Sequence, residues 1–217
     1  MYKEPPNYKN MEQQGWRKNA RSVIANLQEK NITKKITTYA WRFGYNEEQI
    51  REKIRSDKMF AAHFATDPKK QKLHEVAAAD WLAGIPSVEK FESLPSSGRG
   101  SLYVTADGEI QEGRGRAPGK SLDFRWITKG KTCIASHKYT DQTGGAQDQQ
   151  FNEMVELLKR FRNCAEADYV LIVIVDGPYY TEKKMQKLLD LIRNDKLRSF
   201  AVHIEQVPGI LSELSNE

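Results

Sequence analysis

The run YVLIVIV, residues 169–175, constrains the fold of this chain more than any other part of its sequence. An unbroken apolar run of this length, rich in Val and Ile, is typical of a central strand that is buried on both faces of a sheet. An amphipathic helix is predicted over 181–194, and a last strand over FAVHIE, 200–205. The C-terminal part of the chain is therefore expected to be an α/β unit with helices covering a sheet.

The segment before this run predicts further helices and strands. A helix is expected over 68–82, before Gly, Pro and Ser interrupt the pattern in GIPSVEKFESLPSSGRG. SLYVT and EIQ flank the turn ADG as a small hairpin, and SLDFRWIT and KTCIASHK form a strand pair around a Gly-containing turn. A helix over about 147–162 then leads into the apolar run. This order predicts the α/β class, with a mixed β-sheet flanked by helices.

The first third of the chain is predicted to be helical. Apolar residues recur at helical spacing after Gly15, and ITTYAWRFGY predicts a second helix that ends at Gly44, because glycine readily adopts the left-handed conformation that terminates helices. Asn46, with Gln49 three residues further on, has the pattern of a capping box and begins a third helix. The chain therefore has an N-terminal helical region before its α/β core.

Charge gives this helical region a candidate role. Residues 1–72 hold 16 Lys and Arg against 8 Asp and Glu, whereas residues 73–217 hold 18 against 21. Clustered basic residues suit an element that binds a polyanion, although a solvated helical surface has the same composition. Helix, glycine turn and helix is an arrangement used to read DNA and also occurs in plain helical hairpins, which makes Arg42 a candidate DNA contact. We divide the chain into a helical recognition region, 1–65, and a core, 66–217.

Several classes of protein are not supported by the sequence. No apolar run is long enough to cross a membrane, and the N-terminus MYKEPPNYKNMEQQ has no hydrophobic signal region, so we expect a cytoplasmic protein. Cys133 and Cys164 have neither the number nor the spacing of a disulfide framework or a zinc site, and are expected to be reduced thiols. No repeats or low-complexity segments are evident.

The strand pair holds the candidate active-site residues. Side chains alternate between the two faces of a strand, so Ser136 and Lys138 share one face while His137 points to the other. If the preceding strand pairs through the Gly-containing turn, Asp123 lies near the same end of the sheet as Lys138. An acid, a small polar residue and a lysine are therefore expected to meet there. Taken alone, an isolated Asp and a strand-end Lys are more often surface charges.

These residues also carry a resemblance to a known family. SLDF followed by ASHK resembles the signature of the PD-(D/E)XK nucleases, and KYTDQTGGAQDQQFNEM resembles the stretch after the catalytic lysine in FokI-type cleavage domains. The likeness spans about residues 70–211 and is strongest over 121–154. It implies a restriction-endonuclease-like core in 66–217 that cuts double-stranded DNA with Mg²⁺.

The resemblance also implies a role for each residue of the motif. Asp123 would be the principal Mg²⁺ ligand, and the backbone carbonyl of His137 would be another. Lys138 would lie against the attacking water or the phosphate, where its charge lowers the pKa of the water and stabilises the transition state. Gln150, on the helix that follows, is expected to face the sheet and is a candidate DNA contact. Arg114 and Arg116, in the loop EGRGRAPGK, are candidates for phosphate contacts.

Ser136 departs from the family pattern, because it stands where those nucleases usually have Asp or Glu. The missing charge is expected from Glu75 or Asp80 on the 68–82 helix, or from Glu153 on the next helix, although helical periodicity places Glu153 outside the apolar face. Alternatively, Ser136 suffices through a water molecule, or the site is inactive. Ser136 and Glu75 are therefore named as catalytic candidates, and Glu75 and Glu153 as metal ligands.

The interpretation that follows is a type II restriction endonuclease that acts on double-stranded DNA. One core holds one active site, so cutting both strands requires a homodimer, two successive cuts or a partner subunit. The alternative is a DNA-binding protein that keeps the nuclease fold without its chemistry. A weaker third reading is a nuclease of DNA repair or junction processing.

Overall fold

The computed structural model describes residues 3–113, 121–193 and 198–214, and it divides into two compact units. The helical unit comprises Asn7–His74, and the sheet unit comprises Met1–Pro6 with Glu75–Glu217. The division therefore falls after His74, and the residues before Asn7 belong with the sheet. Trp81 illustrates this, since its indole Nε1 donates a hydrogen bond of 2.8 Å to the carbonyl of Lys3.

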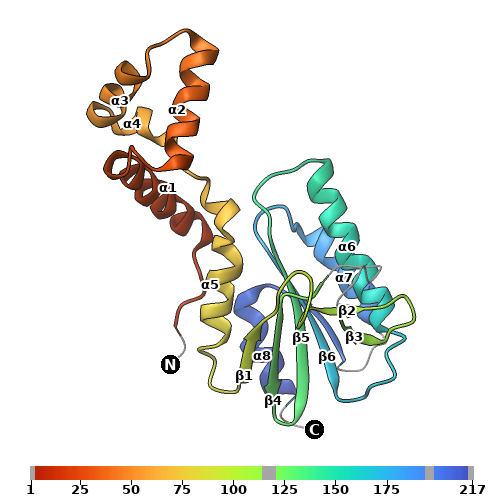
Figure 1. Cartoon of the computed structure of the whole chain (residues 1–217). Coiled ribbons are helices and arrows are strands. Elements are labelled where there is room, and N and C mark those ends of the chain that lie inside the picture. The colour runs from red at the N-terminus through yellow and green to blue at the C-terminus, as the bar shows by residue number, and fades with distance from the viewer. Residues whose placement is uncertain (1–2, 114–120, 194–197, 215–217) are drawn as a thin grey trace. The chain divides into compact units, whose positions relative to one another are not determined.

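The helical unit is built from short helices around a core of its own (Figure 1). Its elements are α1 (Tyr8–Ala25), α2 (Lys30–Phe43), α3 (Glu47–Ser56), α4 (Lys58–Ala62) and the 3₁₀-helix η1 (Pro68–Gln71). Ile36 of α2, Ile54 of α3 and Ala61 of α4 have no exposed surface. Apolar residues recur at helical spacing in these segments, so each helix has one apolar stripe. Burial of these stripes against one another holds the unit together.

The sequence predicted two of these helix ends correctly. Gly44 ends α2 in the left-handed conformation, with φ of 71°, and the side chains of Asn46 and Gln49 form the capping box of α3. The start of α1 was wrong, because the helix begins at Tyr8 rather than after Gly15. The Asn7 side chain caps it, and Gly15 lies inside the helix against Pro68, where a Cβ atom would approach the proline ring to 2.9 Å.

The predicted helix over 68–82 is divided in two. Lys72 adopts a left-handed conformation with φ of 55°, which ends η1 and separates it from α5 (Leu73–Leu82). Composition did not reveal this break, since Lys72 is neither glycine nor asparagine. Most of α5 belongs to the sheet unit and packs there through Ala78, Trp81 and Leu82.

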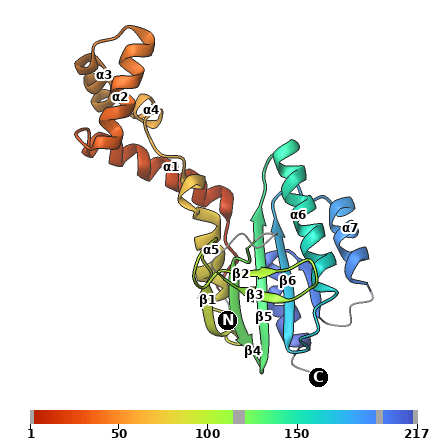
Figure 2. The same ribbon diagram turned by 45° about the vertical axis from the view of Figure 1, so that its right-hand side comes forward.

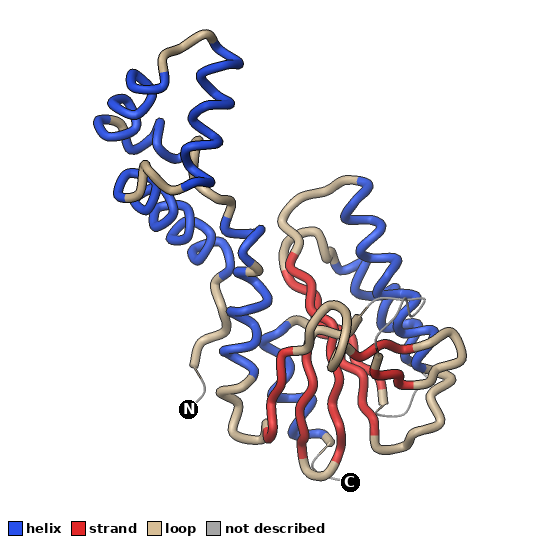
Figure 3. Tube along the Cα trace, viewed as in Figure 1, coloured by secondary structure: helices blue, strands red, loops and turns tan. Residues whose placement is uncertain are grey.

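The sheet unit contains a five-stranded mixed sheet with helices on both faces, as predicted (Figures 1 and 3). The strand order is β1 (Glu89–Ser93), β4 (Phe124–Thr128), β5 (Lys131–Tyr139), β6 (Tyr169–Asp176) and β7 (Ser199–Val202). β4 is antiparallel to both β1 and β5, whereas β6 pairs in parallel with β5 and β7 pairs in parallel with β6. β6 is the apolar run of the sequence, and it lies inside the sheet between β5 and β7.

Helices lie on both sides of this sheet (Figure 2), and one apolar cluster is buried on each face. On one face, α5 and α8 (Val207–Glu213) pack against residues such as Cys133 and Ala135 of β5. On the other face lie α6 (Gly145–Phe161), α7 (Glu182–Ile192) and the small hairpin of β2 (Leu102–Val104) and β3 (Ile110–Glu112). Ile134 of β5 belongs to this second cluster, so the alternation of the strand decides which face each side chain enters.

Three elements of the sheet unit were not predicted from the sequence: β1, α8 and the 3₁₀-helix η2 (Ile204–Gln206). η2 replaces the end of the strand expected over 200–205, since β7 ends at Val202. β1 lies in the stretch where Gly and Pro predicted a break, and Phe91 is its one half-buried residue, which is typical of a short, charged edge strand. The C-terminal helix α8 starts with Pro208 in its first turn, a position where proline is well tolerated. Among the helices in the described ranges, none has the length and apolar content needed to span a bilayer.

Candidate active site at the end of strands β4 and β5

A tight hairpin aligns the two strands that carry the candidate residues. Lys129 and Gly130 at the turn both have positive φ values, 47° and 80°, which match the two-residue turn that follows the twist of paired strands. The register runs from Thr128 opposite Lys131 to Phe124 opposite Ala135. Asp123 immediately precedes β4, and its backbone N–H donates a hydrogen bond of 2.8 Å to the carbonyl of Ala135.

This register places the Asp123 carboxylate beside the end of β5. Its Oδ2 atom accepts hydrogen bonds from the Ser136 hydroxyl at 3.0 Å and from the backbone N–H of His137 at 2.8 Å. The Lys138 ammonium lies 3.9 Å from the same oxygen. The side chains of Asp123 and Lys138 are 15% and 16% exposed, whereas Ser136 is fully buried. An acid, a hydroxyl and a lysine thus meet at one point that solvent still reaches.

The alternation of β5 separates this site from a second polar cluster. The His137 side chain points to the opposite face and its Nε2 lies 3.3 Å from Oδ2 of Asp176, the last residue of β6. The backbone N–H of Ile204 donates to Asp176 Oδ1 at 3.0 Å, and His203 Nδ1 lies 3.7 Å from that oxygen and 2.7 Å from the Val175 carbonyl. A buried carboxylate is therefore held between two histidines directly behind the site.

Sequence reasoning did not identify this Asp176 cluster, defined as Asp176, His137 and His203. The available signal was an aspartate that ends an otherwise apolar strand. The three members come from β5, from the end of β6 and from the residue after β7, which are distant in the sequence. Their meeting depends on the parallel register that pairs Tyr139 with Asp176.

The predicted supporting acids lie on flanking helices. Glu75 is half-buried near the start of α5 and Asp80 is exposed near its end, and the apolar side of this helix covers the face opposite Ser136 and Lys138. Glu153 is half-buried on α6, which covers the same face as those two residues. Within the described ranges, no three His, Cys, Asp or Glu side chains form a group able to hold a metal ion.

Two oxygen atoms at this site are nevertheless suitable ligands for one hard cation such as Mg²⁺. Mg²⁺ binds oxygen ligands and commonly uses only one or two carboxylates, with water and substrate phosphate completing its shell. Asp123 provides a carboxylate whose Oδ1 is the oxygen not engaged by Ser136 and His137. The N–H and C=O groups of one strand residue point to the same side in an antiparallel pair, so the carbonyl of His137 points to the side on which Asp123 lies. These two oxygens would hold Mg²⁺.

A polar contact fixes the start of α6 beside this region. The Tyr179 hydroxyl donates to Asp148 Oδ1 at 2.5 Å, and the Lys184 ammonium of α7 lies 3.1 Å from the same atom and 3.3 Å from the centre of the Tyr179 ring. The hydrogen bond from Tyr179, followed by that from Lys184, lowers the pKa of the Asp148 carboxyl. Next to them, burial raises the pKa of Tyr180 to about 12, so this phenol stays protonated.

The predicted DNA contacts have separate positions. Gln150 is half-buried in the first half of α6, and Arg42 is exposed in the last turn of α2 in the helical unit. Arg114 and Arg116 lie outside the described residues. Helical periodicity placed α6 correctly on the sheet, because Phe151, Met154 and other apolar residues of that helix are buried there.

Comparison with known proteins adds little to this site. No protein-family model matches the chain, and no curated protein sequence matches it. Among solved structures, the crystal structure of protein VC1899 from Vibrio cholerae aligns with a TM-score of 0.33 and 12% identity. The alignment covers 100% of this chain and 57% of that protein. A similarity at this level carries no argument about function.

Proposed function

We propose that this protein is a Mg²⁺-dependent endonuclease that hydrolyses phosphodiester bonds of double-stranded DNA, of the PD-(D/E)XK class and the type II restriction kind. The observation that carries the proposal is the open end of the β4–β5 hairpin, opposite its turn, where Asp123, Ser136 and Lys138 converge on one partly exposed point. Hydrolysis of a phosphodiester needs a positioned cation site and a positive charge near the phosphate, and these residues supply both.

Each residue has a distinct task in this proposal. Asp123 and the carbonyl of His137 hold the cation, which supplies Lewis acidity and neutralises phosphate charge when bound. Ser136 and the N–H of His137 both donate to Oδ2 of the carboxylate, which leaves Oδ1 outside these two hydrogen bonds. Lys138 lies beside the carboxylate, where it donates to a phosphate oxygen and stabilises the negative charge that develops during attack.

The wider proposal includes the partners and the place of action. The helical unit has 15 Lys and Arg against 7 Asp and Glu, which suits contact with DNA phosphates. Since one chain offers one such site, cleavage of both strands is assigned to a homodimer on DNA or to a partner subunit. A cytoplasmic location, where a restriction enzyme meets incoming DNA, completes the proposal.

The test is incubation of the full chain with supercoiled plasmid DNA, in Mg²⁺ or in EDTA, beside the Asp123→Ala variant. We expect discrete fragments that require Mg²⁺ and disappear in the variant. Diffuse degradation that persists in Asp123→Ala would indicate a contaminating nuclease and overturn the assignment.

A second candidate is a DNA-binding protein with the same fold and no catalysis. The observation that favours it is Ser136, a neutral hydroxyl fully buried against the carboxylate where the resembling nucleases carry a second acid. Tight Mg²⁺-independent DNA binding without cleavage, for the wild-type chain at any DNA sequence tested, would favour this candidate.

A further inference from the structure

The helical unit carries an exposed aromatic surface that duplex binding does not explain. We define the aromatic surface as Tyr39, Phe43, Tyr45 and Phe60, from α2, the α2–α3 turn and α4. Phe43 is 54% exposed and Tyr45 is 57% exposed. Large apolar side chains that gather in the open usually mark a binding site.

The rings of this surface are arranged around Tyr39. Its ring stacks nearly parallel to that of Tyr45, with an interplanar angle of 14° and 6.4 Å between centroids. The ring centroid of Phe43 lies 4.6 Å from that of Tyr39. The Phe60 ring packs edge-on against the Tyr39 ring, with 5.7 Å between their centroids. Tyr39 is therefore held by its neighbours, while Tyr45 and Phe43 keep ring surface open to a ligand.

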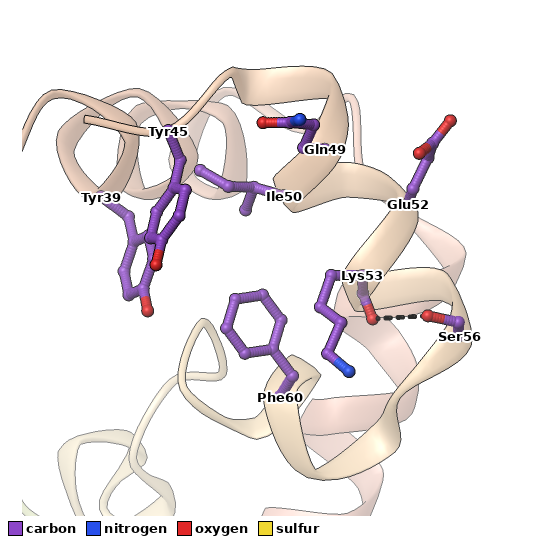
Figure 4. A pocket seen from close by; sticks show the side chains of 8 residues that line it. All are labelled: Tyr39, Tyr45, Gln49, Ile50, Glu52, Lys53, Ser56 and Phe60. Atoms are coloured by element: carbon purple, nitrogen blue, oxygen red, sulfur yellow. Dashed lines mark hydrogen bonds between the residues drawn. The ribbon is translucent and has the colours of Figure 1, made fainter. Parts of the chain in front are cut away.

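A hollow of about 650 Å³ opens beside the Tyr39 and Tyr45 rings (Figure 4). Phe60 forms its opposite wall, Ile50 lies between, and the Lys53 side chain extends towards Phe60. Polar groups of Gln49 and Ser56 are also part of the lining. Volumes of this size hold small planar ligands, with a few polar groups to orient them.

A second hollow, of about 400 Å³, lies on the other side of Tyr39 and is basic. Its lining includes Phe43 together with Lys34, Lys35 and Arg42. The Lys35 ammonium donates to the carbonyls of Phe64 and Ala65, so it serves the fold. Lys34 and Arg42 are exposed on the surface of α2, and their charges face solvent.

Aromatic faces flanked by cations match one ligand chemistry. In a duplex only the edges of the bases are accessible from the grooves, whereas unpaired bases offer their faces to aromatic side chains. A strand whose bases stack on Tyr45 and Phe43 would carry phosphates that Lys34 and Arg42 neutralise. The excess of basic residues in this unit complements such a strand.

We propose that the aromatic surface of the helical unit binds single-stranded nucleic acid, or unpaired bases of a longer DNA, by stacking. This inference concerns residues 7–74 and does not require the sheet unit to be catalytic. It differs from the reading of a duplex groove by a helix–turn–helix, which the sequence of α2 and α3 suggested.

The test measures fluorescence anisotropy of a labelled single-stranded DNA oligonucleotide and of the matching duplex, with the full chain in EDTA so that no cleavage occurs. Wild type is compared with Tyr45→Leu and Phe43→Leu, which keep an apolar side chain at exposed positions. The matched control is Trp16→Leu, since Trp16 is an exposed aromatic residue of α1 that lines a different hollow. Circular dichroism melts establish that each variant is folded.

We expect the single strand to bind more tightly than the duplex. Tyr45→Leu and Phe43→Leu should each weaken single-strand binding by about five- to 150-fold, the loss that one stacked base gives, while Trp16→Leu leaves it unchanged. Arg42→Gln should also weaken single-strand binding, and the affinity of this variant should depend less steeply on salt concentration than that of the wild type. Equal loss in Trp16→Leu, or duplex binding that is tighter and insensitive to both substitutions, would overturn the inference.

One further outcome would assign the surface to protein contact instead. If Tyr45→Leu changed the mass of the chain in light scattering but not its affinity for the oligonucleotide, the surface would be a self-association interface, and the inference would fail. Plasmid cleavage tests the catalytic proposal separately. If Asp123→Ala loses cleavage but still binds the oligonucleotide, the stacking inference stands. If the wild-type chain binds the oligonucleotide but cuts no DNA, only the catalytic proposal is rejected.

Discussion

Lys138 and Asp123 are the two residues on which the proposed hydrolysis depends most directly. The ammonium and the carboxylate are 3.9 Å apart, and both remain partly exposed at the end of a buried strand. A lysine near a carboxylate in this position has two possible tasks, to balance the charge of the acid or to contact a substrate. Substitution separates these tasks, because only the second affects turnover without affecting the fold.

Lys138→Ala should lower the rate of plasmid cleavage by at least about 100-fold, the usual effect of removing one group that stabilises transition-state charge, while DNA affinity changes little. Lys131→Ala is the matched control, since Lys131 begins the same strand and lies 3.9 Å from Asp168 at the far end. Single-turnover cleavage rates measure both. A Lys138 variant that cuts at the rate of the control would refute the assigned role.

Asp176 is expected to matter for stability rather than for chemistry. It is buried, accepts a hydrogen bond from the Ile204 N–H, and lies between His137 and His203. Asp176→Ala leaves the Ile204 N–H without its acceptor, so we expect a loss of about 1–3 kcal/mol in the free energy of unfolding. Asp176→Asn retains the Oδ1 acceptor and should lose less. Urea denaturation of the two variants gives the comparison, and equal losses would contradict it.

At the scale of elements, two glycines with positive φ have different tasks. Gly130 lies in the β4–β5 turn with open space around it, whereas a Cβ atom on Gly177, after β6, would lie 2.3 Å from the Thr140 carbonyl oxygen. Gly130→Ala should therefore cost about 1–2 kcal/mol from backbone strain alone. Gly177→Ala should cost about 1–3 kcal/mol more, because the chain after β5 must move. Thermal melting measures both, and similar melting temperatures would count against the clash.

The contact between α6 and α7 predicts a dependence on pH. The hydrogen bond from Tyr179 and the ion pair with Lys184 lower the pKa of Asp148 below its ordinary value of 3.8. An acid whose pKa is lower in the folded state stabilises the fold above its unfolded pKa and loses that contribution as the pH falls through the folded value. Wild type should therefore be more stable than Asp148→Asn at pH 7, and the difference should shrink as the pH falls below 3.8 and be lost below the lowered pKa of the folded state.

Denaturation midpoints between pH 2.5 and pH 7 test this dependence. In a Tyr179→Phe background, which removes the strongest of these interactions, the effect of Asp148→Asn at pH 7 should shrink. A difference that stays constant down to the lowest pH would exclude the carboxylate as its source.

The elements also show which parts of the structure local sequence can predict. The β4–β5 hairpin, the buried β6 and the capping box of α3 each depend on residues close together in the chain, and all three were predicted. The site followed from them, since strand alternation and a two-residue turn suffice to bring Asp123 to Ser136. The break at Lys72, the edge strand β1 and the Asp176 cluster depend on tertiary contacts, which no local pattern contains.

At the scale of the molecule, charge and apolar burial divide the chain in the same place. The helical unit has its own core, in which Ile36 and Ile54 are fully buried, and it carries a basic excess. The sheet unit has two further cores and, including Met1–Pro6, holds 19 Lys and Arg against 22 Asp and Glu. The proposed binding of nucleic acid and the proposed catalytic chemistry therefore concern different units.

This division predicts that each unit loses its structure separately. Ile54→Ala and Leu171→Ala each remove a fully buried side chain from one core, at a cost of about 2–5 kcal/mol. Hydrogen exchange measured by mass spectrometry should show faster exchange over 7–74 in the first variant and over the sheet strands in the second, with the other unit unchanged. Faster exchange throughout the chain in either variant would show one cooperative fold. Separate responses would instead mean that oligonucleotide binding can be weakened in the helical unit while the geometry of Asp123, Ser136 and Lys138 is preserved.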